Sequence, residues 1–518
     1  MVTVLILLAA VGILVWGFIR ARPDGKLGIF AWLQSVVLVL PWLTFFGLFS
    51  IGIYLNLAWV LILVLFSTGA YIYLGRQLRS LAEAAAPQKE TEPGSESTQF
   101  HRPNGAEAAA APIETAPADG DKNPTDGDTA PADGDTTPES SESKPVTPPA
   151  IPTDDLAEIE TIFGVDTFFR TETVPYQAGV FFKGNLRGDP EASLTALTAQ
   201  LENRFDDRYR LFLINGPDEK PAVIVLPSKT DPKPSDRRQQ IFAVALAIAT
   251  FITSLETGAL LRDFNLFDQP SRWLEALPTA VAVLTILVVH ELGHRWQANR
   301  YNIKLSPPFA LPAWQLGAFG SLTRFESLLP NRSVLFDISF AGPAASGLLS
   351  LAMLFLGLVL SHPGSPYQLP VEFFRASVLV GTLARAVLGD TLQTVDLVDI
   401  NLLVLMGWLG LVITAINVMP AGRIDGGRMV QAIYGRKIAG RATAVTLVLL
   451  TIIALANPIA LYWAALILFL QRGEERPCLN DISEPDDTRA ILILVILFLM
   501  LAILLPLPPN LASRFGIG

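Results

Sequence analysis

The chain has 518 residues, of which 51% are hydrophobic and 17% charged, and its formal net charge is −10. A mean hydropathy of +0.42 is too high for an ordinary soluble enzyme, so we interpret the chain as a membrane protein. It contains a single cysteine, Cys478, which excludes an internal disulfide and a zinc site made of cysteines. Any bound metal must therefore be held by nitrogen and oxygen atoms.

Repeated apolar runs predict transmembrane helices, because about 20 apolar residues are needed to cross a bilayer as a helix. We count ten such runs, of which the ninth is short. They occupy residues 2–19, 28–50, 54–74, 239–261, 276–298, 333–360, 396–420, 441–456, 458–471 and 489–507. No small-residue cleavage site follows the first run, so we expect it to be retained as a span. Lys and Arg flank alternate loops, which predicts that those loops are cytoplasmic and that the N-terminus lies outside.

A large water-exposed part lies between the third and fourth runs. Residues 76–150 are rich in Ala, Pro and acidic residues and predict a disordered linker. Within it, the stretch 119–128 is rich in Asp, but Pro124 stands where a calcium loop needs glycine, so we expect no calcium there. Residues 151–235 alternate helical and strand-like patterns and predict a small cytoplasmic α/β domain.

Five segments of this domain carry a periodic pattern. They are helical patterns at 153–163 and 189–204, and strand-like patterns at 173–187, 209–216 and 222–227. The octapeptide KGNLRGDP ends a strand and opens a helix. We interpret it as a glycine-containing turn with a polar helix cap, because it lacks the spacing of a phosphate loop.

The fifth apolar run contains the sequence VVHELGHRW. His290 and His294 are four residues apart, so on a helix they share one face and can bind a single metal ion. Glu291 points about 100° away, toward a neighbouring water. Ionisable groups inside a membrane are costly unless they are paired, which favours a functional site over a chance match to this HExxH pattern.

The surroundings of this motif predict its depth and its packing. Arg295 and Trp296 mark the cytoplasmic edge of the helix, so we expect the site to lie just inside that edge. The next run contains FAGPAASG, in which Gly342, Ser346 and Gly347 are small enough to permit close helix packing. We interpret this segment as a packing surface for the helix of the two histidines.

A catalytic zinc site uses three protein ligands and leaves one position for water, so a third ligand is expected. Five carboxylates lie in or beside the runs. They are Glu256, Asp337, Asp396, Asp399 and Asp425. Glu256, Asp396 and Asp399 fall toward the outer half, and Asp337 could instead stabilise its helix start or accept a hydrogen bond from a histidine. His101 in the linker and His362 on the opposite side are unattractive.

Asp425 is the favoured third ligand, in the segment INVMPAGRIDGGRMV. The seventh run returns to the cytoplasmic side at this point, and Pro420 breaks the helix. The glycines around Asp425 let the backbone bend so that its carboxylate can turn inward. The alternative interpretation is an ordinary Asp-Gly loop turn beside basic residues.

The HELGH motif inside one span and the Asn-Pro-Asp segment in a later span resemble the site-2 protease family of M50-type intramembrane zinc metalloproteases. GNLR, the ten runs and the segment PPFALPAWQLGAFGSLTRF are similar to its EGY-like branch of plants and cyanobacteria. This resemblance implies that His290, His294 and Asp425 bind one Zn²⁺ ion per chain. It also implies that Glu291 is the general base and that Asn417 stabilises the polar intermediate.

The resemblance implies hydrolysis of peptide bonds in membrane-embedded substrates by metal-activated water. A helical substrate has no free backbone groups, so it must be unwound locally. We hypothesise that 305–325 form a re-entrant β-like hairpin whose edge pairs with the substrate, the alternative being a loop on the lipid surface. The candidate substrate-binding residues are Gly317, Ala318, Phe319 and Gly320.

The expected fold is thus an α-helical polytopic membrane protein of about ten transmembrane helices, with the hairpin and the small cytoplasmic α/β domain. It divides into an N-terminal three-span segment (1–75), a disordered linker (76–150), the α/β domain (151–235), a metalloprotease membrane core (236–475) and a C-terminal loop with the last span (476–518).

Two other functions stay open. One is a metal or proton transporter using intramembrane His and Asp groups, and the other is an inactive protease-like scaffold whose α/β domain binds partners. Expected partners are transmembrane protein substrates, membrane lipids and a protein partner of the α/β domain, with no nucleic acid. The resemblance places the chain in a bacterial, specifically cyanobacterial, plasma or thylakoid membrane, with its site near the cytoplasmic face.

Overall fold

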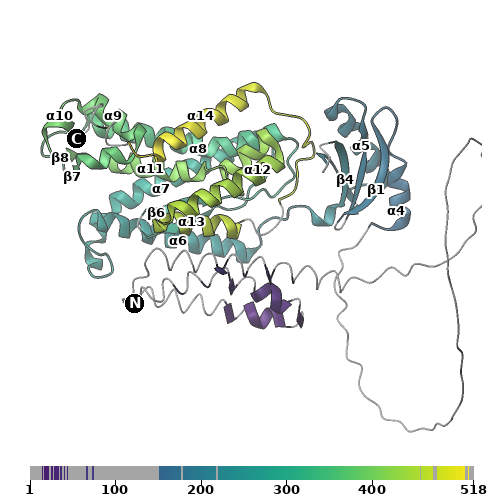
Figure 1. Cartoon of the computed structure of the whole chain (residues 1–518), viewed down its shortest axis with the longest axis horizontal. Helices are drawn as coiled ribbons and strands as arrows, with labels where there is room; N and C mark the ends of the chain where they lie inside the picture. Colours follow the sequence, from purple (N-terminus) through teal and green to yellow (C-terminus); the bar gives the residue numbers. More distant parts are fainter. Residues whose placement is uncertain are drawn as a thin grey trace, which may run out of the picture. The chain divides into compact units, whose positions relative to one another are not determined.

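The computed structural model describes residues 151–507 apart from 177–178, 217–219, 315, 456 and 471–474, together with residue 512 and scattered helical residues between 14 and 77 (Figure 1). The chain divides into two compact units, 1–145 and 146–518, and the second contains the site. The first three expected spans lie largely outside the described residues. The linker, its Asp-rich stretch and His101 fall in 76–150, where the structure describes only Gln77.

An antiparallel four-stranded sheet with two helices follows the linker. Its elements are α4 (Thr153–Glu160), β1 (Phe168–Tyr176), β2 (Gly179–Leu186), α5 (Pro190–Phe205), β3 (Tyr209–Asn215) and β4 (Pro221–Pro227). The strand order is β1-β2-β4-β3, so β1 and β3 are the edge strands. Leu197, Leu201 and Phe205 of α5 are buried with Phe168 and Phe182 of the sheet. One face of the sheet is therefore covered by the domain's own helices.

The other face of this sheet is apolar as well, because side chains alternate between the two faces along each strand. Phe181, Phe212 and Ile224 form a second buried cluster, which Leu328 and Leu479 from outside the domain join. The sheet is therefore packed on both sides. Its second face meets chain segments that belong to the helical part of the molecule.

The strand-like stretch expected at 173–187 is two strands, since β1 ends at Tyr176 and β2 begins at Gly179. The two strands pair antiparallel, with Tyr176 opposite Gly179. Both halves have a strand-like composition, so composition alone gave no sign of the reversal. The polar helix cap expected after GNLR is confirmed, because Asp189 accepts hydrogen bonds from the backbone N–H groups that begin α5.

Four helices in the described part of the chain are long and apolar enough to cross a membrane. They span Arg237–Leu260 (α6), Pro270–Arg300 (a short 3-10 turn and α7, Trp273–Arg300), Arg332–Val359 (α8) and Asp487–Leu504 (α14). The remaining helices are α9 (Val378–Leu388), α10 (Thr391–Thr394), α11 (Leu402–Asn417), α12 (Asp425–Ile453) and α13 (Pro458–Leu470). The count of ten spans stays a prediction.

Two of the expected spans differ from the structure in their bounds. The run at 396–420 begins with β8 (Leu397–Ile400), which pairs with β7 (Tyr367–Pro370), so α11 starts only at Leu402. The run at 441–456 is the second half of α12, whose backbone leaves helical geometry at Gly435, with φ +81°. Hydropathy alone marks neither a short strand inside an apolar run nor a kink.

Helix α8 lies at the centre of the helical part, with α7 and α11 packed against it (Figure 1). A Cβ atom on Gly293 of α7 would lie 2.5 Å from the carbonyl oxygen of Ala341 in α8. A Cβ atom on Gly407 of α11 would lie 2.3 Å from the backbone nitrogen of Leu354. Such contacts permit no larger residue, and the contact of Gly293 with Ala341 confirms that FAGPAASG packs against the helix of the two histidines.

A β-hairpin is present within the expected region, formed by β5 (Phe309–Ala313) and β6 (Gly317–Leu322). It packs against α6, and β6 also contacts α7 and α11. The ring of Phe319 stacks on Tyr462 of α13 with centroids 5.0 Å apart. The hairpin is therefore held among helices, and its placement relative to a bilayer stays a prediction.

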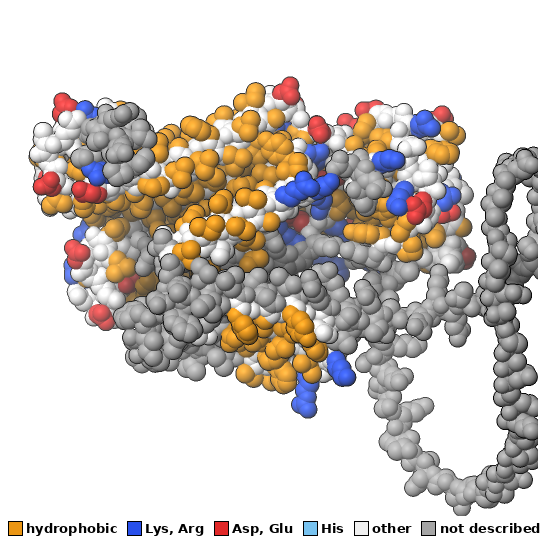
Figure 2. Space-filling view, in the orientation of Figure 1, with side chains coloured by type: hydrophobic (Ala, Val, Ile, Leu, Met, Phe, Trp, Pro, Cys, Tyr) orange, Lys and Arg blue, Asp and Glu red, His pale blue; other side chains and the backbone are white. Residues whose placement is uncertain are grey.

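The surface of the helical part matches a lipid environment. Hydrophobic side chains cover the visible faces of the long helices, and charged side chains gather at the helix ends and on the α/β domain (Figure 2). On α14, for example, Ile491, Leu494 and Phe498 are exposed. A soluble protein rarely exposes a continuous apolar surface of this kind.

Candidate metal centre

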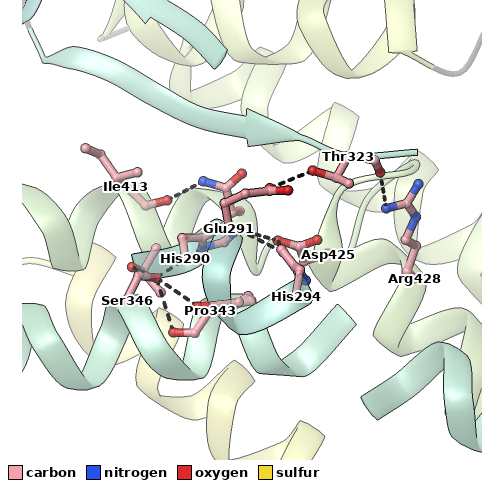
Figure 3. Close-up of polar contacts among 12 residues, drawn as sticks. His290, Glu291, His294, Thr323, Pro343, Ser346, Ile413, Asp425 and Arg428 are labelled. Carbon is pink, nitrogen blue, oxygen red and sulfur yellow. Dashed lines mark hydrogen bonds and ion pairs between the residues drawn. The ribbon is translucent and has the colours of Figure 1, made fainter. Parts of the chain in front are cut away.

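His290 and His294 on α7 and Asp425 at the start of α12 converge on one point (Figure 3). The two Nε2 atoms are 3.0 Å apart, and Oδ2 of Asp425 lies 3.1 Å from that of His290 and 3.4 Å from that of His294. All three side chains are buried. In the described part of the chain this is the one group of three or more His, Cys, Asp or Glu residues that could hold a metal ion.

The backbone before Asp425 turns too tightly for most side chains. Gly422 has φ +56°, in the left-handed region that favours glycine. A Cβ atom on Gly426 would lie 1.9 Å from the carbonyl oxygen of Val418, and one on Gly427 would lie 2.2 Å from that of Gly422. These glycines let the chain fold back after α11 and begin α12 with the carboxylate facing α7.

The three side chains fit one Zn²⁺ ion. In a tetrahedral site with zinc–ligand distances near 2.0 Å, two ligand atoms are about 3.3 Å apart, which is close to the separations found here. Oδ2 of Asp425 is buried and makes no hydrogen bond to any described residue. A buried carboxylate oxygen without a hydrogen-bond donor is costly, so a cation at this point would compensate it.

The second ring nitrogen of each histidine is held by a neighbouring residue of α8. Nδ1 of His294 lies 2.7 Å from the carbonyl oxygen of Ile338, which can only accept, so Nδ1 carries the proton and Nε2 keeps its lone pair for a metal. Nδ1 of His290 is 3.1 Å from Oγ of Ser346, which also contacts Thr414 of α11. Sequence reasoning treated Ser346 only as a packing residue and did not single out Ile338 or Thr414.

Glu291 lies beside the centre with both carboxylate oxygens engaged. Thr323, just after β6, donates a hydrogen bond of 2.8 Å to Oε2. Nε of Arg295, one turn later on α7, lies 2.9 Å from Oε1. No sequence pattern marks Thr323 as a partner of Glu291, because only the fold of the hairpin brings it to α7.

Asn417, the last residue of α11, faces the hairpin. Its amide nitrogen donates to the carbonyl oxygens of Phe319, at 2.9 Å, and of Ile413, at 2.7 Å. Gly320 makes this contact possible, because a Cβ atom there would lie 2.3 Å from that nitrogen. Of the expected substrate-binding residues, Phe319 and Gly320 therefore contact Asn417 directly.

The other carboxylates considered as a third ligand lie elsewhere. Asp337 forms a two-pronged ion pair with Arg489 of α14 and accepts a hydrogen bond from Tyr301. Glu256 is fully buried on α6, where it accepts from the backbone of Leu266. Asp399 accepts from the backbone N–H of Gly364 and from the side chain of Gln368. Neither these three nor Asp396 and His362 belong to the metal-binding group.

A small cavity with room for about one water molecule adjoins the centre. Its lining residues are His294, Leu305, Thr323, Phe325, Ile338, Ser339 and Arg428. It therefore connects a histidine of the centre with the threonine that holds Glu291. Together, the fold and this site define a helical membrane protein with a His-His-Asp metal centre built on an HExxH helix.

Comparison with known proteins gives the family. The model of peptidase family M50 matches residues 278–457, and that of the EGY3 middle domain matches 157–234. Chloroplastic "Probable zinc metalloprotease EGY2" of Oryza sativa subsp. indica is 40% identical over 356 residues, covering 67% of this chain and 65% of the relative. Chloroplastic "Probable zinc metalloprotease EGY1" of Arabidopsis thaliana is 36% identical over 403 residues, covering 71% and 74%. No solved structure matches the chain.

The chain belongs to peptidase family M50 and to the EGY group of zinc metalloproteases within it. Its aligned part spans just under two thirds of the rice relative's length. The expectation of a bacterial membrane is wrong, because these relatives are chloroplastic plant proteins and point to a plant chloroplast membrane.

Proposed function

We propose that this protein is an intramembrane zinc metalloprotease that hydrolyses peptide bonds of membrane-embedded protein substrates. The observation that carries this proposal is the buried group of His290, His294 and Asp425 with Glu291 on the same apolar helix. The relatives carry names of zinc metalloproteases, which disfavours the transporter and the inactive scaffold. Transmembrane substrates and lipids are the partners that this activity requires.

A bound zinc ion supplies the Lewis acid that acidifies a water molecule and polarises the scissile carbonyl. Glu291 accepts the water's proton and returns it to the leaving amine. Its hydrogen bond with Thr323 and its ion pair with Arg295 fix the direction of the carboxylate. The protonated Nδ1 of His294 keeps its Nε2 available as a ligand throughout.

Asn417 has two amide hydrogens, and the carbonyl oxygens of Phe319 and Ile413 use both. It therefore donates to the reaction's polar intermediate only after one of these bonds is released. We propose that the Phe319 bond is released, because an extended substrate pairing with β6 offers its own N–H to that carbonyl. Substrate binding at Gly317–Gly320 would then free the amide of Asn417 at the moment it is needed.

The remaining proposals concern topology and division of the chain. We propose that each of the ten apolar runs crosses the membrane and that the hairpin re-enters it. We propose the parts 1–75, 76–150, 151–235, 236–475 and 476–518, with the core at 236–475 as the protease. The α/β domain keeps its proposed role as a docking site for a protein partner.

The proposal is tested with the full chain purified in lipid vesicles together with a single-span substrate. We expect wild type to cleave the substrate, and Glu291→Gln to lose cleavage while keeping one zinc per chain. Zinc flux through vesicles without cleavage would favour the transporter. A protein that neither binds zinc nor cleaves would favour the scaffold.

A further inference from the structure

A chain of contacts leads from Glu291 to the segment that precedes α14. The hydroxyl of Thr323 donates to Glu291, and the carbonyl oxygen of the same Thr323 accepts a 2.9 Å hydrogen bond from Nη1 of Arg428. Nη2 of Arg428 donates to Glu475 at 2.7 Å. Thr323 is thus held on its backbone side by an arginine while its side chain holds the glutamate (Figure 3).

The position of Arg428 allows it to hold the backbone of Thr323. It lies one helical turn after Asp425 on α12 and is buried, with 7% of its surface exposed. The ring of Phe325 lies 4.7 Å from its guanidinium carbon. A buried guanidinium is costly unless its charge is compensated, and Glu475 is the carboxylate that compensates it.

Glu475 begins a segment, 475–481, that we call the strap. The strap forms backbone hydrogen bonds on two sides. Leu479 donates to the carbonyl oxygen of Leu329, just before α8, at 2.9 Å, and accepts from Leu213 of β3 at 2.8 Å. Asp481 donates back to Leu213 at 2.8 Å. The strap thereby joins the edge strand of the α/β domain to the helical part.

Arg476 strengthens this connection, because its guanidinium donates to the carbonyl oxygen of Thr230 in the α/β domain. Two consecutive strap residues therefore contact different parts of the molecule. Glu475 contacts Arg428 beside the metal centre, and Arg476 contacts the domain. A shift of the domain relative to the core would act on both contacts at once.

We propose that Thr323 and Arg428 are positioning residues for Glu291, and that the strap sets their placement through Glu475. The α/β domain then controls how well Glu291 is aligned, without contacting the substrate. This inference rests on the proposed function, because it assumes that Glu291 moves the proton. The hydrogen-bond partners of metal ligands typically contribute about 10- to 100-fold in metal affinity or activity, and we expect an effect of the same size for the partners of Glu291.

The test compares the full chain in lipid vesicles with five single variants and one double variant, Thr323→Val with Glu475→Ala, using a single-span substrate and separate kcat and KM values. Thr323→Val removes the hydroxyl at nearly constant volume, and Thr323→Ser retains it. Glu475→Ala removes the carboxylate beside Arg428. Glu484→Ala is the matched control, since Glu484 lies in the same connecting segment but is exposed. Glu291→Gln tests the proposed function itself.

We expect Thr323→Val and Glu475→Ala each to lower kcat by about 10- to 100-fold, with KM and zinc content unchanged. Thr323→Ser and Glu484→Ala should match wild type. Because both changes act on one chain of contacts, the double variant should lose little more than the stronger single variant.

Three outcomes would overturn the inference. The first is normal kcat in Thr323→Val or Glu475→Ala while Glu291→Gln is inactive, which leaves the proposed function intact. The second is loss of zinc in Thr323→Val, since holding Glu291 leaves the metal ligands untouched. The third is a fully multiplicative double variant. Cleavage by Glu291→Gln at the wild-type rate would instead refute the proposed function.

Discussion

Gly342 of α8 stands so close to His294 that a Cβ atom on it would lie 2.2 Å from Nε2 of the imidazole. Because glycine has no side chain, Nε2 of His294 can occupy the space that a Cβ atom at position 342 would fill. The same turn of α8 supplies the Ile338 carbonyl oxygen that holds the other ring nitrogen. Helix α8 thus fixes His294 by contact on one side and by a hydrogen bond on the other.

Gly342→Ala should consequently displace His294 and weaken zinc binding by about 10-fold or more, because the packed interior leaves no room for the ring to move aside. The matched control is Gly347→Ala on the same helix, whose Cβ atom would meet Thr414 at an ordinary 3.5 Å. Zinc content and affinity, measured by competition with a chelator, decide the matter. Equal affinities in the two variants would contradict this account.

Asp425→Asn should abolish stable zinc binding, because the substitution removes the negative charge that faces both histidines. Asp337→Asn is the control for a general loss of a partly buried carboxylate, since Asp337 contacts Arg489 and Tyr301 instead. It should keep zinc and lose thermal stability. Zinc retained in Asp425→Asn but lost in Asp337→Asn would reassign the third ligand.

Ser346→Ala should reduce zinc affinity by about 10- to 100-fold, because it removes the hydroxyl that orients His290. Ser350→Ala, one turn further along α8, provides the comparison. Ser350 is equally buried, but its hydroxyl donates only to a backbone carbonyl oxygen. The prediction fails if both serine variants bind zinc as tightly as wild type.

Gly320→Ala should lower cleavage strongly while zinc content stays at one per chain, because its Cβ atom would push Asn417 away from Phe319. The backbone of Gly320 also has φ +126°, so strain must be separated from the clash. Gly364→Ala serves this purpose, having φ +89° but open space around its Cβ position. Cleavage by Gly320→Ala at the wild-type rate would show that the hairpin has no role in the reaction.

The sequence predicted the metal-binding group well because its signals are local. His290 and His294 share a helix face by spacing alone, and Asp425 stands where a span returns to the same side. The sequence itself shows the carboxylate, the two imidazoles and the glycines near a helix break. The long apolar helices α6, α7, α8 and α14 are predictable for the same reason, since length and composition suffice.

The residues that orient the metal-binding group and Glu291 were not predictable, because they belong to other helices and to the hairpin. Thr323 looks like an ordinary polar residue after a strand, and only the packing of the hairpin on α7 gives it Glu291 as a partner. Arg428 reads as one more basic residue near a membrane edge. The sequence pattern indicates only that Ser346 is small, whereas in the structure its hydroxyl also contacts Nδ1 of His290. Function assigned by motif therefore needs the fold to complete it.

The strap also has a consequence for how the protein is made. Strand β3 is a sheet edge, and an unpaired edge readily pairs with other chains. Its native neighbour at Leu213 is Asn480, which the ribosome adds only after helices α6 to α13. In the nascent α/β domain, the edge strand β3 therefore lacks this neighbour while the membrane helices are inserted. Glu475 is likewise added after Asp425, so a nascent chain would hold the three candidate metal ligands before it holds the strap. On our proposal, Glu291 would be poorly aligned at that stage, and such a chain would cleave other membrane proteins only slowly.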